Sequence, residues 1–268
     1  VKHPVLAIRN VVPGPLLTPR WAAAHSATLF SATLAPMDFV AHMLGLPAGT
    51  LRVDVPSPFL PEQLAVRVAP HISTRWSDRQ ASLTPMAEVM AAQYAAEPGN
   101  YLAFFSSFDY LQQALDRLQQ RHPALPVWAQ SRGMSEPERD AFVARFTEGG
   151  QGIGFAVLGG AFGEGIDLPG RRLIGAFIAT LGLPQVNPVN EAMKARMERL
   201  FGNGHAFAYL YPGLQKVVQA AGRVIRTPED EGVLYLIDDR FARPEVRRLL
   251  PTWWQVELLR LPVTLPLL

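Results

Sequence analysis

Three side chains that could bind an anion lie close together in the last quarter of the sequence. Gln219, Arg223 and Arg226 fall at positions i, i+4 and i+7, so they would share one face of a helix. Two guanidinium groups and an amide that point the same way suit an anion with several oxygens, such as the γ-phosphate of a nucleotide. Gly222 has no side chain and would let a ligand approach closely. The pattern predicts an anion-binding face, and a solvated basic face on a surface helix is the alternative.

A glycine-rich acidic segment is the second candidate site. Gly159, Gly160 and the run Gly-Glu-Gly-Ile-Asp-Leu-Pro-Gly at 163–170 follow an apolar stretch that we expect to be a buried strand. The carboxyl end of a parallel strand is where α/β proteins bind ligands. Glu164 and Asp167 would repel a phosphate, so they better suit a ribose hydroxyl, a water or an arginine of the first motif, while glycine N–H groups could meet a DNA phosphate. A tight turn capped by Asp167 is the alternative.

Two pairs of small hydroxyl residues add to these motifs. Ser106 and Ser107 stand where a predicted strand passes into a helix, and they could donate to a phosphate at the N-terminus of that helix. Ser31 and Thr33 end another apolar run, where hydrogen bonds could switch as two lobes move. The alternatives are that Ser107 is only an N-cap and that the second pair is a common strand-to-helix junction. Neither pair identifies a function by itself.

The elements that position these residues follow from hydrophobic periodicity. Short apolar runs alternate with longer amphipathic segments, which is the pattern of α/β proteins with a parallel sheet. The strands we expect are Tyr101–Ser106, Val127–Gln130, Gly154–Leu158, Leu173–Ala179 and Val233–Ile237, with one or two more within residues 47–75. The helices we expect are Pro36–Leu44, a segment through Phe108 and Leu118, one that begins at the Ser135/Glu138 capping box, Pro188–Leu200, Leu214–Ile225 and one from Pro244.

Composition limits the class of protein. With 268 residues, 49% of them hydrophobic and 18% charged, the chain can bury a substantial core. A net charge of +2 tolerates a nucleic-acid partner without requiring one. The absence of cysteine excludes disulfides, thiolate zinc sites and cysteine-bound iron–sulfur clusters within this sequence. Because we find no signal peptide, and because Glu257, Arg260 and three prolines interrupt the apolar C-terminal tail, we expect a cytoplasmic protein without a membrane partner.

In their order and spacing the four motifs resemble those of superfamily 2 DNA helicases of the DinG/XPD group. Residues 31–34 (Ser-Ala-Thr-Leu) resemble motif III, and 104–111 resemble motif IV. Residues 163–170 resemble motif V, and 219–226 match motif VI. The end of the chain, 239–254, also resembles the end of DinG-like proteins, so that the resemblance spans roughly residues 25–254. The branch, whether the bacterial DinG/YoaA type or a more distant one, stays open.

The resemblance implies a RecA-like parallel sheet flanked by helices. It implies that residues 1–48 are the tail end of a first helicase lobe, including motif III, and that residues 49–268 are the C-terminal RecA-like lobe. The sequence holds no P-loop and no Asp-Glu-x-His box, which the resemblance assigns to the first lobe, as it does any iron–sulfur cluster. Without the first lobe's sheet, we expect residues 25–35 to form an irregular appendage or to pair with another chain.

The resemblance also implies an activity and a role for each motif. The chain would be the C-terminal lobe of an ATP-dependent 5′ to 3′ DNA helicase that works with ATP and Mg²⁺, both bound mainly by the first lobe, and we expect it to be inactive as an ATPase by itself. Its partners would be single-stranded DNA and the first lobe. The implied roles are arginine fingers at Arg223 and Arg226 supported by Gln219, coupling to ATP at Gly163, Glu164, Gly165, Asp167 and Gly222, DNA contacts at Ser106, Ser107 and Gly160, and interlobe coupling at Ser31 and Thr33.

Two other functions stay open at this point. The chain could be a non-catalytic nucleic-acid or protein binding module derived from a helicase lobe. It could also be a stand-alone nucleotide enzyme that uses the loop Gly159–Gly170, but no Gly-x-Gly-x-x-Gly follows the first strand of a βαβ unit here. A P-loop encoded upstream would favour the helicase over the binding module.

Overall fold

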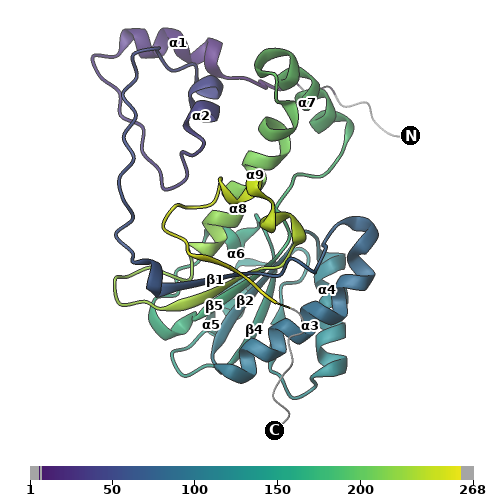
Figure 1. Cartoon of the computed structure of the whole chain (residues 1–268). Coiled ribbons are helices and arrows are strands. Elements are labelled where there is room, and N and C mark those ends of the chain that lie inside the picture. The colour runs from purple at the N-terminus through teal and green to yellow at the C-terminus, as the bar shows by residue number, and fades with distance from the viewer. Residues whose placement is uncertain (1–5, 7, 261–268) are drawn as a thin grey trace. The chain divides into compact units, whose positions relative to one another are not determined.

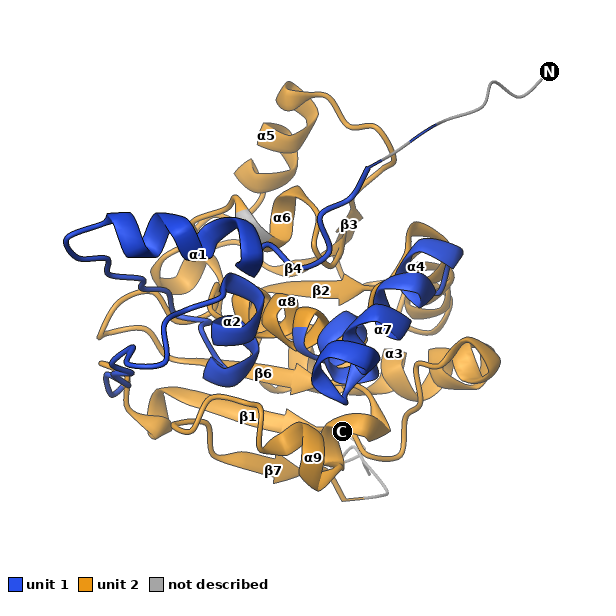
Figure 2. Cartoon of the chain, turned by 90° about the horizontal axis from the view of Figure 1, so that it is seen from above, with its two compact units in different colours: residues 1–56, 185–211 blue, residues 57–184, 212–268 orange. Residues whose placement is uncertain are grey.

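The computed structural model describes residue 6 and residues 8–260 of the chain. These residues fall into two compact units, shown in blue and orange in Figure 2. The first, here the helical unit, comprises Val1–Pro56 and Gln185–Tyr211, and the second, here the sheet unit, comprises Ser57–Pro184 and Pro212–Leu268. The predicted division between residues 48 and 49 concerns the lobes of a longer protein, and it stays a prediction.

In the described part of the chain, the sheet unit contains seven parallel strands (Figure 1). They are β1 (Leu64–Val68), β2 (Asn100–Phe105), β3 (Val127–Ala129), β4 (Gly152–Val157), β5 (Gly175–Ala179), β6 (Gly232–Leu236) and β7 (Val256–Leu258). Their order in the sheet is β3-β4-β2-β5-β6-β1-β7, and each neighbouring pair is parallel. The carboxyl ends of all the strands therefore lie at one edge, here called the carboxyl edge, as the α/β prediction requires.

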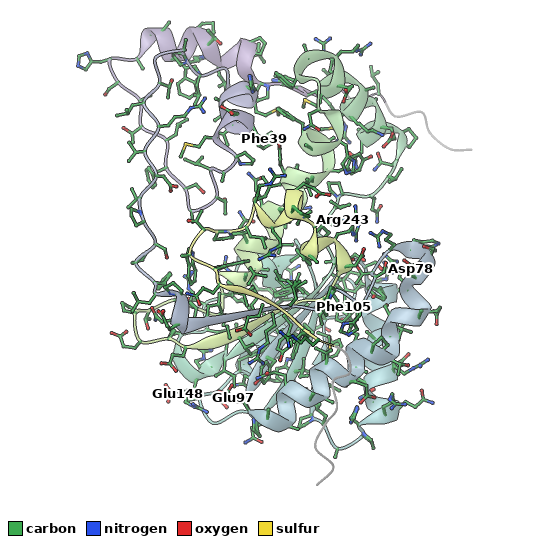
Figure 3. The ribbon with its side chains drawn as sticks, viewed as in Figure 1. Phe39, Asp78, Glu97, Phe105, Glu148 and Arg243 are labelled. Atoms are coloured by element: carbon green, nitrogen blue, oxygen red, sulfur yellow. The ribbon has the colours of Figure 1, made fainter. Side chains whose placement is uncertain are left out.

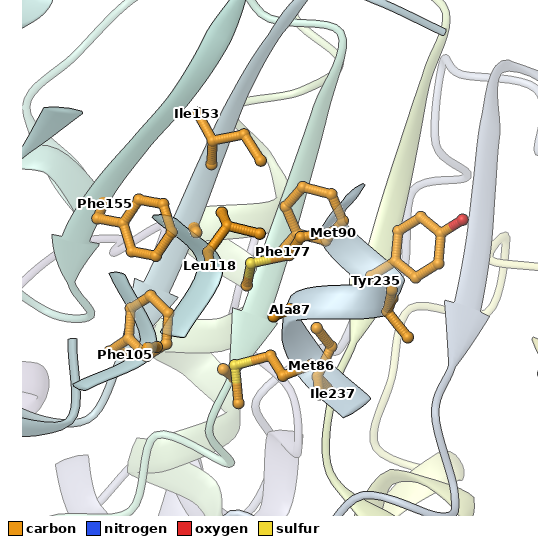
Figure 4. Packing of buried hydrophobic residues seen from close by; sticks show 14 of the residues in the cluster. Met86, Ala87, Met90, Phe105, Leu118, Ile153, Phe155, Phe177, Tyr235 and Ile237 are labelled. Atoms are coloured by element: carbon orange, nitrogen blue, oxygen red, sulfur yellow. The ribbon is translucent and has the colours of Figure 1, made fainter. Parts of the chain in front are cut away.

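Both faces of the central strands are covered, which explains their nearly continuous apolar sequences. Tyr101, Ala103 and Phe105 of β2 are buried in one cluster with residues of α3 (Arg79–Ala96) and α4 (Phe108–Arg121), as Figure 4 shows for part of this cluster. The alternating residues Leu102 and Phe104 are equally buried and face the other side of the sheet. Because both faces are buried, the positions of the strand ends are well defined. The candidate site residues that directly follow these strands, such as Ser106 and Ser107 after β2, are positioned by them.

The remaining elements surround the sheet or form the helical unit. In the sheet unit they are η1 (Pro61–Gln63), η2 (Trp76–Asp78), α5 (Glu136–Ala144), α6 (Ala161–Glu164), η3 (Gly170–Arg172), η5 (Asp239–Ala242) and α9 (Pro244–Arg247). The helical unit contains α1 (Gly14–Ala23), α2 (Met37–Leu44), α7 (Pro188–Phe201) and the π-helical turn η4 (Ala206–Leu210). Helix α8 (Tyr211–Ala221) begins at the last residue of the helical unit and continues in the sheet unit. Within the described part of the chain, no helix is long and apolar enough to cross a membrane.

The helical unit contains the segment that resembles motif III. Residues 24–35 form no strand and no part of the sheet, so the expectation of an irregular segment agrees with the structure. Ser31 Oγ lies 3.3 Å from Thr33 Oγ1 and accepts a hydrogen bond from Thr33 N at 3.2 Å. The core of this unit is small and aromatic, with the rings of Phe39 and Phe207 5.2 Å apart. The two hydroxyl residues therefore bond to each other in an exposed turn.

Candidate functional site

Helix α8 ends earlier than the sequence predicts. Gly222 N still donates to Val218 O at 2.9 Å, but Arg223 N and the next N–H donate three residues back, to Ala220 O at 3.2 Å and Ala221 O at 3.0 Å. The helix therefore ends at Ala221 rather than Ile225. The prediction that three side chains share one helical face is wrong, because only Gln219 lies on the helix, where it is an exposed residue of the last turn. Arg223 lies in the tighter turn that follows, and Arg226 lies just after that turn.

The two arginines nevertheless meet the acidic glycine segment. Arg223 donates from Nε to Gly163 O at 3.3 Å and from Nη1 to Ile166 O at 2.9 Å. Arg226 Nε forms an ion pair with Asp167 Oδ1 at 2.8 Å, and the side chains are 39% and 68% exposed. The sequence left three partners open for Asp167, namely a ribose hydroxyl, a water or an arginine, and in the structure its partner is an arginine. The Arg226 guanidinium group is accessible to solvent, and among the described residues one exposed carboxylate, that of Asp167, holds it.

A buried aspartate fixes the backbone at the junction of the two motifs. Asp230 is 5% exposed, and its Oδ2 accepts from the N–H groups of Arg226 at 2.7 Å and Thr227 at 2.8 Å. Its Oδ1 accepts from Gly170 N at 3.0 Å. Burial by itself would raise the pKa of this carboxyl group, but the hydrogen bonds from these three residues outweigh it and hold the pKa below its ordinary value. Asp230 thus joins the end of the glycine segment to the arginine turn.

The glycines differ in whether the fold requires them. Gly159 and Gly170 have φ angles of 76° and 63°, a region that side chains disfavour. Gly222 has no positive φ, and a Cβ there would make only ordinary contacts, the nearest at 3.4 Å from Val218 O. At Gly163, too, a Cβ would meet no atom of the described residues within 4 Å. No backbone constraint that the structure describes explains these last two glycines. Close approach of a ligand to them, as expected for Gly222 from the sequence, therefore stays a prediction.

The hydroxyl pair lies at the carboxyl edge, directly after β2. Ser107 is the N-cap of α4, and its Oγ accepts from Tyr110 N at 3.3 Å. Ser106 Oγ accepts from Arg79 Nη2 at 2.8 Å. Ser107 therefore is an N-cap, as the alternative to phosphate binding proposed. Because both serine hydroxyl groups act as acceptors in these bonds, each O–H can still donate to a phosphate. Gly160 N, a predicted DNA donor, instead donates to Val157 O at 3.2 Å within the loop.

The loop between β4 and β5 connects the two groups of residues. It leaves the carboxyl edge at Gly159, passes Arg223 and Arg226, and returns to the amino end of β5 after Gly170. In Figure 3, Asp78 and Arg243 mark the carboxyl edge of the sheet unit, while Glu97 and Glu148 mark the opposite edge. The middle of this loop thus contacts Arg223 and Arg226, whereas its start leaves the same edge of the sheet that carries Ser106 and Ser107.

Some predicted residues are not brought into this arrangement. The side chain of Glu164 lies outside what the structure describes, so its predicted coupling role stays a prediction. Gly165 lies tightly against the backbone, where a Cβ would be 3.0 Å from Ala161 O. Ser31 and Thr33 belong to the helical unit, whose own geometry is given above.

Sequence reasoning missed three residues of this region. Asp230 acts on backbone N–H groups, which have no sequence signature, although its position four residues after Arg226 could have drawn attention to it. Lys216 lies beside the glycine segment, since a Cβ on Gly159 would be 3.2 Å from Lys216 Cδ. Arg79 reaches Ser106 from a different segment, a contact that only the tertiary fold reveals.

The chain is similar to helicases in sequence and in structure. Residues 90–257 match the family described as the helicase C-terminal domain. The ATP-dependent DNA helicase chl-1 of Caenorhabditis elegans is 30% identical over 67% of this chain and 22% of its own length. The ATP-dependent helicase DinG of Mycobacterium tuberculosis is 27% identical over 94% of this chain and 38% of its own length. The chain therefore spans well under half of these relatives.

Two solved XPD structures share the fold. One, described as an XPD helicase, superposes with a TM-score of 0.65 and 20% identity over 85% of this chain and 42% of its own. The other, described as apo XPD, gives a TM-score of 0.68 and 20% identity over 85% of this chain and 47% of its own. At this identity the likeness concerns the fold, and it agrees with the predicted RecA-like sheet.

Proposed function

Because this chain belongs to the helicase C-terminal domain family, as a member of its DinG/XPD group, we propose that it forms the second motor lobe of an ATP-dependent 5′ to 3′ DNA helicase. The observation that carries the proposal is that Arg223 and Arg226 both reach the acidic segment at 163–170. Motifs V and VI are thereby in contact. In this role the lobe supplies arginine fingers to a nucleotide bound by the first lobe.

Arg226 is the better placed of the two to change partners. Its ion pair with Asp167 is exposed, and exposed pairs contribute about 0–1 kcal/mol, so releasing Asp167 costs little. A γ-phosphate carries more charge and can accept two parallel N–H bonds from one guanidinium. On nucleotide binding, Arg226 exchanges the carboxylate for the phosphate and stabilises the charge of the transferring group. Arg223 can contact the phosphate as the second finger only after it gives up its bonds to Gly163 O and Ile166 O.

The remaining residues have supporting roles in this proposal. Gly222 leaves room for the nucleotide, Gln219 adds an amide near it, and Asp167 transmits its release to the loop. Ser106 and Ser107 donate to the backbone of single-stranded DNA at the start of α4, where peptide N–H groups also favour a phosphate. The first lobe holds Mg²⁺, and the described residues of this chain contain no group of three or more His, Asp or Glu side chains that could hold a metal.

The decisive experiment removes the Arg226 guanidinium from the full-length protein. Arg226→Ala should lower the kcat for DNA-stimulated ATP hydrolysis by about 10³-fold or more, the range seen for arginine fingers. Arg226→Lys should recover little, because an ammonium group cannot make the bidentate contact. Arg247→Ala, an exposed arginine on α9, is the matched control. Normal turnover in Arg226→Ala would refute the assignment.

A second experiment concerns the chain by itself. It should not hydrolyse ATP, because we assign the phosphate-binding loop and Mg²⁺ to the first lobe. Adding the first lobe, covalently or in trans, should restore hydrolysis. Robust magnesium-dependent turnover by the isolated chain would contradict this division of roles.

A further inference from the structure

The loop between β1 and α3 presents an exposed indole ring on the sheet unit. Trp76 is 82% exposed and lies in the short helix η2, which follows β1 at the carboxyl edge. Among the described residues of the sheet unit, no other aromatic side chain is exposed. Large apolar side chains are normally buried when the fold allows it. An exposed tryptophan therefore calls for a reason, particularly if its loop is rigid.

The loop that carries Trp76 is firmly anchored. Arg75 makes a bidentate ion pair with Asp239, at 2.6 Å and 2.9 Å, and also donates to Ser73 Oγ at 2.8 Å. Thr74 N donates to the fully buried Asp238 at 3.0 Å. The carboxyl end of β6 thus holds the two residues directly before Trp76. The exposed ring is preorganised and does not belong to a loose segment.

A guanidinium group supports one side of the ring. Arg79 Cζ lies 4.8 Å from the centroid of Trp76 and 4.8 Å from the centroid of Tyr110, within the range of cation–π contact. The same guanidinium donates to Ser106 Oγ at 2.8 Å. One side chain therefore connects the exposed indole to the residue proposed to touch the DNA backbone. Asp78, the N-cap of α3 that adjoins them in sequence, is visible at this edge in Figure 3.

We propose that Trp76 is a stacking platform for a base of single-stranded DNA whose backbone passes Ser106 and Ser107. This inference depends on the proposed function for the position of the strand. An aromatic ring backed by a cation beside a phosphate-binding helix start combines the two contacts that proteins use for single strands, namely base stacking and backbone attraction. Every base has a π-face, so the platform binds without sequence preference.

The test compares strands with and without bases. Binding of the full-length protein is measured by fluorescence anisotropy on a labelled oligothymidylate, and on a strand of equal length in which abasic sites replace the bases. Trp76→Ala should weaken binding to the first strand by about 5- to 100-fold, the range for loss of one stacked base. On the abasic strand, wild type and Trp76→Ala should bind alike. Trp76→Phe should keep most of the affinity, and Leu60→Ala, which removes another side chain that is 63% exposed, should keep all of it.

Each other outcome overturns a defined statement. Equal weakening of Trp76→Ala on both strands would mean that the loop has lost its shape, and it would refute stacking. Wild-type affinity of this variant on both strands would also refute it. Failure of the wild-type protein to bind either strand would refute the proposed function itself, together with the platform that depends on it.

Discussion

Two aspartates hold Arg226, and their surroundings differ. Asp167 binds its exposed guanidinium group, whereas Asp230 is buried and binds its backbone N–H. We expect Asp167→Asn to change the free energy of unfolding by less than about 1 kcal/mol, because the pair is exposed to solvent. ATP turnover by the full-length protein should nevertheless fall, because in the proposed function Asp167 transmits the release of Arg226. Urea denaturation and a steady-state ATPase assay on one preparation check both parts, and unchanged turnover would contradict the coupling role.

Asp230→Asn should have the opposite profile, with a large loss of stability. The carboxylate accepts from three backbone N–H groups, and an amide would turn an NH₂ group towards one of them. We expect a loss of about 2 kcal/mol at neutral pH. Because the folded pKa of Asp230 is lowered, its contribution is present above the unfolded value of about 3.9 and is lost as pH falls through the folded value. The difference in free energy of unfolding between the wild type and the variant should therefore stay constant from pH 7 to about pH 5 and narrow below about pH 4 in urea denaturation. A difference that stays constant down to about pH 3 would refute the assignment.

At this scale the sequence is informative where side chains carry the chemistry. The types and spacing of Arg223, Arg226 and Asp167 identified the two segments and named an arginine as one of three partners for Asp167, and the structure contains that pair. Asp230 and Arg79 were missed because their partners are backbone groups or come from distant segments. Spacing along one chain does not encode such contacts.

Two substitutions of Ser107, at the start of α4, can distinguish its role as an N-cap from its proposed role in DNA binding. Ser107→Ala removes the side-chain acceptor for Tyr110 N and should cost about 1 kcal/mol of stability. Ser107→Asp should restore that stability, because aspartate is also a good N-cap and its charge suits the helix dipole. The same charge would repel a phosphate, so single-stranded DNA should bind more weakly to the full-length Asp variant than to wild type. DNA affinity that follows stability across both variants would leave Ser107 with a structural role alone.

Helix α8 has a glycine near each end, and the two are constrained differently. A Cβ on Gly213 would lie 2.8 Å from Leu181 O, a backbone atom that cannot move freely. Gly213→Ala should therefore destabilise the fold by about 1–3 kcal/mol. Gly222→Ala meets only ordinary contacts and should fold like wild type, yet lower ATP turnover if a nucleotide approaches there. Thermal denaturation measures the loss of stability and an ATPase assay measures the loss of turnover. Normal turnover in Gly222→Ala would contradict the prediction that a nucleotide approaches Gly222.

The elements that the sequence predicts well are those with strong periodic contrast. The five expected strands are present, and β1 lies within 47–75 as anticipated. Helix α3 was missed because it is rich in alanine and contains Pro85, which weakens the apolar pattern. Strand β7 was missed because it is short and half-exposed at the edge of the sheet. The early end of α8 depends on contacts of the arginine turn with the 163–170 loop, which are tertiary.

At the scale of the whole molecule, stability should vary strongly along the chain. The central strands β2 and β5 are buried along their whole length, whereas residues 24–35 form no regular element and are largely exposed. Amide hydrogen exchange should be slowest in β2 and β5, and fastest in 24–35, because exchange follows the free energy of local opening. Mass spectrometry of peptides from each segment checks this. Slow exchange in 24–35 would show that this segment is ordered by contacts that the structure does not describe.

The loop between β4 and β5 has a thermodynamic consequence for any motor that uses it. One end follows the edge that carries Ser106, and its middle holds both arginines. Suppose that a bound nucleotide favours one arrangement of this loop, and that the same arrangement changes the affinity of the carboxyl edge for single-stranded DNA. Bound DNA must then change the affinity for nucleotide by the same factor. The affinity for DNA and the affinity for nucleotide would then depend on a single conformational equilibrium. Any mutation in this short segment that changes that equilibrium would change both affinities.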